Sequence, residues 1–168
     1  MNSQRVVVTG TGSISPLGMT GDQMWEGLCE GRSGIGEIKS FDASGFTCRI
    51  AGEVPEFKIN KFVPKTSRKA IKLMSRDIEL SIVAALDAIS NSGLKTKGIN
   101  PEDVSVDPKR MGINLGAGLI SCDLVEISPA VAASKTDGNF DIKKWGEQGL
   151  GLVTPVWLLK YLPNMLPC

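Results

Sequence analysis

Residues 65–92 form the longest periodic stretch of the sequence and constrain its fold more than any other part. Apolar side chains recur there at steps of three and four residues, as on an amphipathic helix: Ile71, Met74, Ile78, Ile82, Leu86 and Ile89. Thr66 or Ser67 is suited to cap the start, and Gly93 is suited to the position just after the end. The stretch therefore predicts one long helix, or two in tandem, with one face against a core.

The beginning of this stretch carries a concentration of positive charge. The basic residues there are Lys65, Arg68, Lys69, Lys72 and Arg76. Side chains four positions apart share one face of a helix, so these charges gather away from the apolar stripe. Two interpretations stay open. The charges form a solvated helix face, as charge runs usually do, or they form a docking site for an acidic partner.

The bulk composition is that of an ordinary globular chain. A length of 168 residues fits one domain spanning 1–168, and the net charge of +1 gives no overall field that favours nucleic acid or a membrane surface. The N-terminal apolar run is too short for a signal peptide or a membrane span. We therefore expect a cytoplasmic protein with reduced thiols and no nucleic-acid or membrane partner.

The sequence contains no histidine, which excludes much of the usual catalytic chemistry. Ser–His, Cys–His and histidine–metal sites cannot be built from these residues alone. The cysteines are scattered and form no CxxC pair: Cys29, Cys48, Cys122 and Cys168. A metal site and a disulfide framework are both improbable on this spacing, and we expect no cofactor.

Two short β-branched or alternating segments predict central strands, at residues 5–9 and 110–116. Helical patterns lie over 20–30, with Thr20 or Asp22 suited to cap the start, from 122 onward, and after Thr154-Pro155. Residues 49–54 indicate a short edge strand, and the glycine-broken residues 135–151 indicate a mobile segment. Strand, helices and strand in this order indicate a parallel α/β arrangement.

The first predicted strand is followed by Gly10-Thr11-Gly12, which raises the hypothesis of a dinucleotide-binding turn and a nucleotide-dependent oxidoreductase. Three features oppose it. Ser15 replaces the third glycine, Pro16 lies where a phosphate-binding helix needs free N–H groups, and no acidic residue ends a second strand at the required distance. We expect instead that Gly10 and Gly12 permit close packing after the strand.

Several segments together resemble the β-ketoacyl-acyl-carrier-protein synthases, the condensing enzymes of the thiolase-like fold. The similar segments are RVVVTGTGSISPLG, GLCEGRSGIGEIKSFDASGFTCRIAGEV, SRKAIKLMSRDIELSIVAALDAI, RMGINLGAGL and TPVWLLKYLPNM. The resemblance covers essentially the whole chain. It implies an α/β fold, an incomplete N-terminal half of a thiolase-like αβαβα layered architecture that stops before the nucleophile strand.

The resemblance also implies a chemistry. Such enzymes load an acyl chain from acyl carrier protein onto a cysteine thiolate, decarboxylate a malonyl thioester and join the two by Claisen condensation, in fatty acid or polyketide biosynthesis. Their nucleophile and both histidines correspond to positions beyond residue 168, and Cys168 does not match the nucleophile. We therefore expect no catalytic residue in this chain and no condensing activity from it alone.

Two binding features follow from the resemblance, residue by residue. Lys65, Arg68 and Lys69 match the basic patch that docks acyl carrier protein, and Leu119 matches a position lining the acyl-chain pocket, although a core leucine at a strand end is equally consistent. The expected partners are acyl carrier protein and either a second copy, as a homo-oligomer, or a missing C-terminal half. The alternative is a non-catalytic carrier-binding or partner-half module. A chain that lacks the other half should expose apolar surface that the missing half would cover, and we expect such chains to associate or aggregate.

Overall fold

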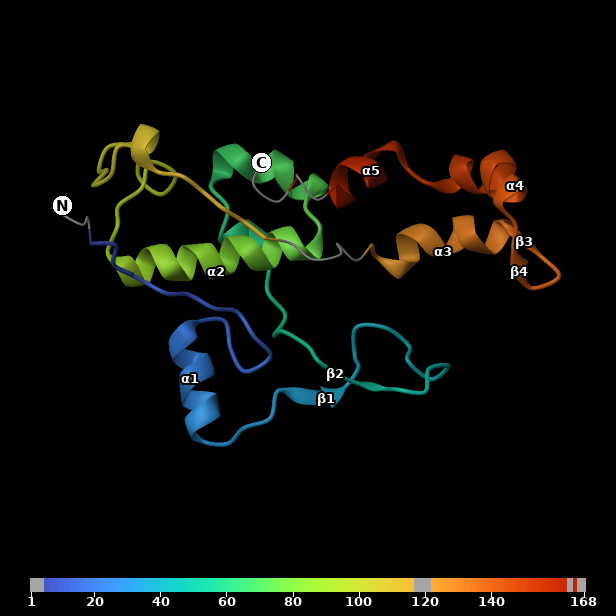
Figure 1. Cartoon of the computed structure of the whole chain (residues 1–168), viewed down its shortest axis with the longest axis horizontal. Helices are drawn as coiled ribbons and strands as arrows, with labels where there is room; N and C mark the ends of the chain where they lie inside the picture. The colour runs from blue at the N-terminus through green and yellow to red at the C-terminus, as the bar shows by residue number, and fades with distance from the viewer. Residues whose placement is uncertain (1–4, 117–121, 163–164, 166–168) are drawn as a thin grey trace. The chain divides into compact units, whose positions relative to one another are not determined.

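The computed structural model of the chain describes residues 5–116, 122–162 and 165 (Figure 1). The chain divides into two compact units. Unit 1 comprises Met1–Arg68 and Glu79–Gly112, and unit 2 comprises Lys69–Ile78 and Ile113–Cys168.

The predicted helical stretch is two helices in tandem, which confirms the second of the two alternatives. The first is a 3₁₀ helix, η2, over Lys65–Leu73, and the second is an α-helix, α2, over Arg76–Ser92. Ser75, between the two helices, is fully buried, and Val83 on α2 is only 2% exposed. The chain leaves α2 through Gly93, whose φ of +67° is the left-handed conformation that the sequence predicted for a residue after a helix end.

The N-terminal segment of unit 1 runs along α2 (Figure 1). A Cβ atom placed on Gly10 would lie 2.5 Å from the backbone oxygen of Ala88, and one on Gly12 would overlap the backbone of Ala84 and Ala88. The two glycines therefore let this backbone rest directly on the helix. This confirms the close packing expected of them.

The two predicted central strands are wrong as local structure in this chain. Residues 5–9 and 111–116 have no strand pairing within the described residues, and a 3₁₀ helix, η3, occupies Pro108–Arg110. The side chains of Val6 and Val8 are 95% and 82% exposed. A strand is held by hydrogen bonds to a neighbour, so a β-branched segment without a paired neighbour has the propensity for a strand but not the structure.

Unit 1 also contains a helix and a hairpin. Helix α1 spans Gly21–Cys29, and the Thr20 hydroxyl accepts a hydrogen bond from the N–H of Gln23, as the predicted cap should. Strands β1 (Ile35–Glu37) and β2 (Ile50–Gly52) pair antiparallel, which confirms a short strand within residues 49–54. A short 3₁₀ helix, η1, follows at Ile59–Lys61.

Unit 2 is built around helix α3, Leu124–Ala133, which Asp123 caps. Residues 135–151, for which the sequence predicted no helix or strand, form a series of short regular elements. They form the hairpin β3 (Lys135–Thr136) and β4 (Asn139–Phe140), then α4 (Ile142–Lys144), a π-helical turn η4 (Trp145–Gly149) and a 3₁₀ turn η5 (Leu150–Leu152). Helix α5, Pro155–Tyr161, begins after Thr154 with proline in its first turn, as predicted.

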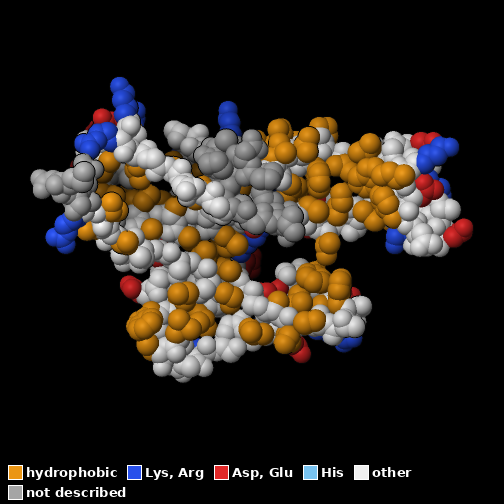
Figure 2. All heavy atoms as spheres, viewed as in Figure 1, with side chains coloured by type: hydrophobic (Ala, Val, Ile, Leu, Met, Phe, Trp, Pro, Cys, Tyr) orange, Lys and Arg blue, Asp and Glu red, His pale blue; other side chains and the backbone are white. Residues whose placement is uncertain are grey.

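Apolar side chains are exposed on both units. Figure 2 shows them over α1 and over α3 and α5, where the exposed residues include Trp25, Leu28, Leu124, Val125 and Leu158. None of the helices in the described part of the chain combines the length and apolar character that a membrane span requires.

Candidate functional site

The predicted docking residues all lie on η2. Lys65 and Arg68 belong to unit 1 and Lys69 to unit 2, together with Lys72. All four residues are exposed. A 3₁₀ helix has three residues per turn, so side chains three positions apart are eclipsed. Lys65 is therefore aligned with Arg68, and Lys69 with Lys72, rather than in the four-residue steps that an α-helix would give.

Arg68 differs from the lysines because its guanidinium is already anchored. Its Nη2 donates a hydrogen bond of 3.1 Å to the backbone oxygen of Asn60, at η1. Lys65 has no carboxylate within ion-pair distance among the described residues. Arg68 thus fixes the start of η2 within unit 1, while Lys65 is available to an external anion.

The remaining predicted site residue, Leu119, lies outside the described residues. Within the described ranges, no three His, Cys, Asp or Glu side chains come together in a way that could hold a metal ion. The whole sequence has no histidine to act as a base beside a cysteine or serine.

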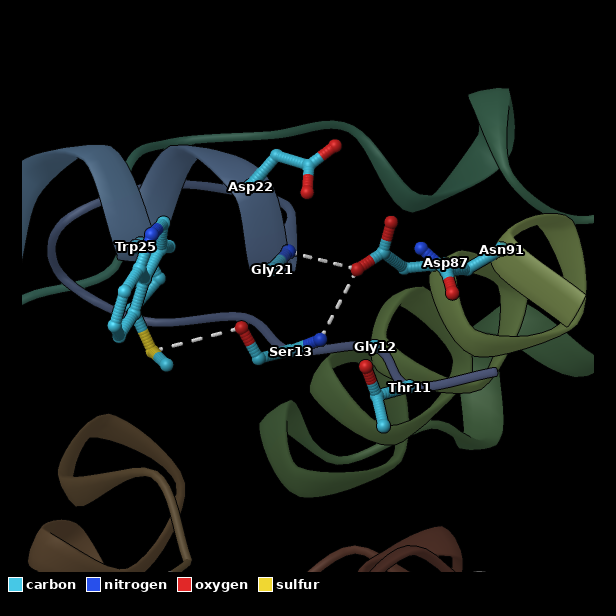
Figure 3. A pocket seen from close by; sticks show the side chains of 9 residues that line it. Thr11, Gly12, Ser13, Gly21, Asp22, Trp25, Asp87 and Asn91 are labelled. Atoms are coloured by element: carbon cyan, nitrogen blue, oxygen red, sulfur yellow. Dashed lines mark hydrogen bonds between the residues drawn. The ribbon is translucent and has the colours of Figure 1, made fainter. Parts of the chain in front are cut away.

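Unit 1 contains a pocket of about 450 Å³ that sequence reasoning did not find. Its floor is organised by Asp87 of α2, as Figure 3 shows. One carboxylate oxygen, Oδ2, accepts hydrogen bonds from the N–H of Ser13 at 3.1 Å and from the N–H of Gly21 at 2.9 Å. Asp87 therefore ties the N-terminal loop and the first residue of α1 to α2.

This arrangement explains an acidic residue within an otherwise apolar helical sequence. Asp87 interrupts IVAALDAIS, and that interruption is the one signal in the sequence that could have identified it. A carboxylate at the start of α1 also complements the positive end of the helix dipole. The pocket walls hold the indole of Trp25, Asp22 and Asn91, with no nucleophile–base pair among its lining residues. We assign Asp87 a structural role.

Comparison with known proteins identifies the family. Residues 3–138 match the sequence model described as the β-ketoacyl synthase N-terminal domain. The 3-oxoacyl-[acyl-carrier-protein] synthase 2 of Vibrio harveyi is 36% identical over 135 residues, which is 80% of this chain and 30% of that protein. The synthase of the same name from Staphylococcus aureus strain N315 is 32% identical over 163 residues, 97% of this chain and 34% of that protein.

One solved structure is also similar, the ishigamide ketosynthase/chain length factor, at 36% sequence identity and a TM-score of 0.46 over 55% of this chain and 22% of that one. The chain spans about a third of the length of the curated relatives that it matches. The family match confirms the α/β, thiolase-like fold class that the sequence predicted. On the match over residues 3–138, the chain belongs to the β-ketoacyl synthase family, within its N-terminal domain.

Proposed function

We propose that this chain is the N-terminal portion of a 3-oxoacyl-[acyl-carrier-protein] synthase and that it supplies the surface on which acyl carrier protein docks. In a whole synthase this surface would serve decarboxylative Claisen condensation in fatty acid or polyketide assembly. The docking residues would be Lys65, Arg68 and Lys69 on η2, with Lys72 aligned beside Lys69 on the same helix.

The exposed basic character of η2 is the observation that supports this proposal. Its residues include four basic side chains and no acidic one. Relatives that are 36% identical are named for action on acyl-carrier-protein thioesters. Cationic side chains at the rim of an interface mainly accelerate the encounter with an acidic partner, and their effect weakens as salt is added.

We further propose that the chain does not catalyse condensation by itself. The resemblance implies a cysteine nucleophile and two histidines that stabilise negative charge on the thioester oxygen. The 168 residues contain no histidine, so the second part of that apparatus is absent from this sequence. Binding without turnover is the behaviour we expect of the purified chain.

The docking proposal is tested by association kinetics with immobilised acyl carrier protein at low and high salt. The variant K65E/R68E/K69E should lower the association rate by about tenfold at low salt, because it replaces attraction with repulsion. The matched control K97E/K109E/R110E has the same charge change at exposed positions outside η2, and it should retain most of the rate. Equal losses in both variants would reject a specific surface on η2.

A second candidate function is a non-catalytic module that pairs with a separate partner half. The exposed valines of residues 6–8 favour it, because a β-prone segment that has no strand pairing within the described residues can accept a strand from another chain. Hydrogen exchange of these amides tests this role, with the chain alone and with a polypeptide covering the remainder of a related synthase. Protection only in the mixture supports pairing, and unchanged exchange rejects it.

A further inference from the structure

Two lysines outside η2 belong to the same basic region, Lys58 and Lys61. Residues 57–76 contain no acidic side chain and seven of the chain's 19 lysines and arginines. The remainder of the sequence therefore has 12 basic residues against 18 acidic ones. The net charge of +1 is therefore the sum of a strongly cationic segment, residues 57–76, and an acidic remainder. The cationic segment begins before Lys65, the first of the proposed docking residues.

The local fold of unit 1 directs these two lysines outward. Helix η1, Ile59–Lys61, is anchored by Ile59 and Val63, which are 6% and 7% exposed. The rings of Phe57 and Phe62 pack edge to face with their centroids 5.7 Å apart. Lys61 is the last residue of η1, Lys58 is the extended residue that directly precedes the helix, and both lysines are exposed.

A side-chain contact joins this turn to the start of η2. The Arg68 guanidinium donates a hydrogen bond to the backbone oxygen of Asn60, the middle residue of η1. The start of η2, up to Arg68, is therefore held to η1 within unit 1. Among the described residues, no carboxylate lies within ion-pair distance of Lys58, Lys61 or Lys65. The part of the chain that the structure describes therefore does not neutralise the charges of these three lysines.

We propose that Lys58 and Lys61 extend the docking surface, so that an acidic protein contacts η1 as well as η2. This inference rests on the proposed function and names the same partner, acyl carrier protein. An acidic protein fits better than single-stranded nucleic acid, because the aromatic rings here pack on each other instead of offering faces for base stacking. The lysines act as mobile point charges that attract carboxylates from a distance.

The test compares K58E/K61E with the charge-matched control K97E/K109E in the full chain, using association rates with acyl carrier protein across a salt series. K58E/K61E should slow association by about fivefold at low salt and flatten the salt dependence, with the dissociation rate little changed. The control should stay within about twofold of the parent chain. Circular dichroism checks that each variant retains its helices.

The outcomes separate this inference from the proposed function. If K65E/R68E/K69E slows association and K58E/K61E matches its control, η1 is not part of the surface and the docking function stands. If the parent chain does not bind acyl carrier protein at all, the proposed function fails and this inference fails with it. If a single-stranded oligonucleotide binds through Lys58 and Lys61 while the carrier protein does not, the partner class is overturned.

Discussion

Gly12 lies where the N-terminal segment crosses α2 with no space for a side chain. An added Cβ would overlap the backbone of Ala84 and Ala88, and backbone atoms cannot move aside cheaply. Gly12→Ala should therefore lower the free energy of unfolding by about 2–3 kcal/mol, measured by urea denaturation. Gly36→Ala is the control, because nothing lies within 4 Å of its added Cβ, and it should change stability by less than about 0.5 kcal/mol. Equal effects would contradict the crossing.

Asp87 is the second residue on which the packing of unit 1 depends. Asp87→Ala leaves the N–H groups of Ser13 and Gly21 without their acceptor, and it should cost about 2 kcal/mol of unfolding free energy. Asp87→Asn retains one carbonyl oxygen and should lose less. Asp22→Asn, at an exposed position of the same pocket, should cost about 0.5 kcal/mol through the helix dipole. A loss at Asp22 as large as at Asp87 would argue against this role.

Among single residues, the sequence predicted a structural role only where the backbone conformation requires a particular residue type. Gly10 and Gly12 were predicted to permit close packing, because glycine is the residue that allows it. Asp87 was not predicted, because its partners are backbone N–H groups 74 and 66 positions away, and no sequence pattern brings those positions together. The exposure of Lys65, Arg68 and Lys69 is established, whereas their role in docking stays a prediction.

Helices α3 and α5 of unit 2 are joined by an ion pair whose strength should depend on pH. Lys160 Nζ lies 2.6 Å from Glu126 Oε1, and the hydrogen bond from Lys160 holds the pKa of Glu126 below its ordinary value of 4.5. Burial lowers the pKa of Lys160, but its hydrogen bonds to Glu126 and Tyr161 outweigh this and raise the pKa above 10.5. Tyr161 also accepts a hydrogen bond from the N–H of Asp123, at the start of α3.

The sign of the pH effect follows from these directions. A carboxylate with a lowered pKa stabilises the fold above its unfolded value, and that contribution disappears as the pH falls through the folded value. The stability difference between the parent chain and Glu126→Gln should therefore shrink below pH 4.5, as measured by thermal unfolding from pH 3 to 7. Glu147→Gln, whose partner Lys143 is 3.9 Å away and highly exposed, is the control. A difference that is constant with pH would contradict the pairing.

The elements divide into those with local signals and those without. The cap of α1, the proline start of α5 and the glycine after α2 each act within a few residues, so the sequence predicted them. The turn of β3 and β4 had a local signal too, because Asp137-Gly138 adopts φ of 49° and 81°, typical of a type I′ hairpin. Residues 5–9 and 110–116 were predicted as strands from propensity, which says nothing about whether a partner strand is present.

Many large apolar side chains of the described residues are exposed to solvent. Val6, Val8, Ile113, Val125 and Ile142 are each at least 68% exposed. We expect the purified chain to associate as its concentration rises, because large exposed apolar patches mark interaction surfaces. Size-exclusion chromatography with light scattering should show this, and V6K/V8K should reduce it. A parent chain that stays monodisperse and monomeric at high concentration would contradict the prediction that its exposed apolar side chains cause association.

The chain is a β-ketoacyl synthase N-terminal domain without histidine, and we propose that it binds the carrier protein but does not make the carbon–carbon bond by itself. The most direct measurement incubates the purified chain with acyl and malonyl acyl carrier proteins and follows both CO₂ release and the 3-oxoacyl product. We predict neither above the rate without protein, under conditions where carrier binding is detected. Product formation dependent on this chain alone would contradict the account.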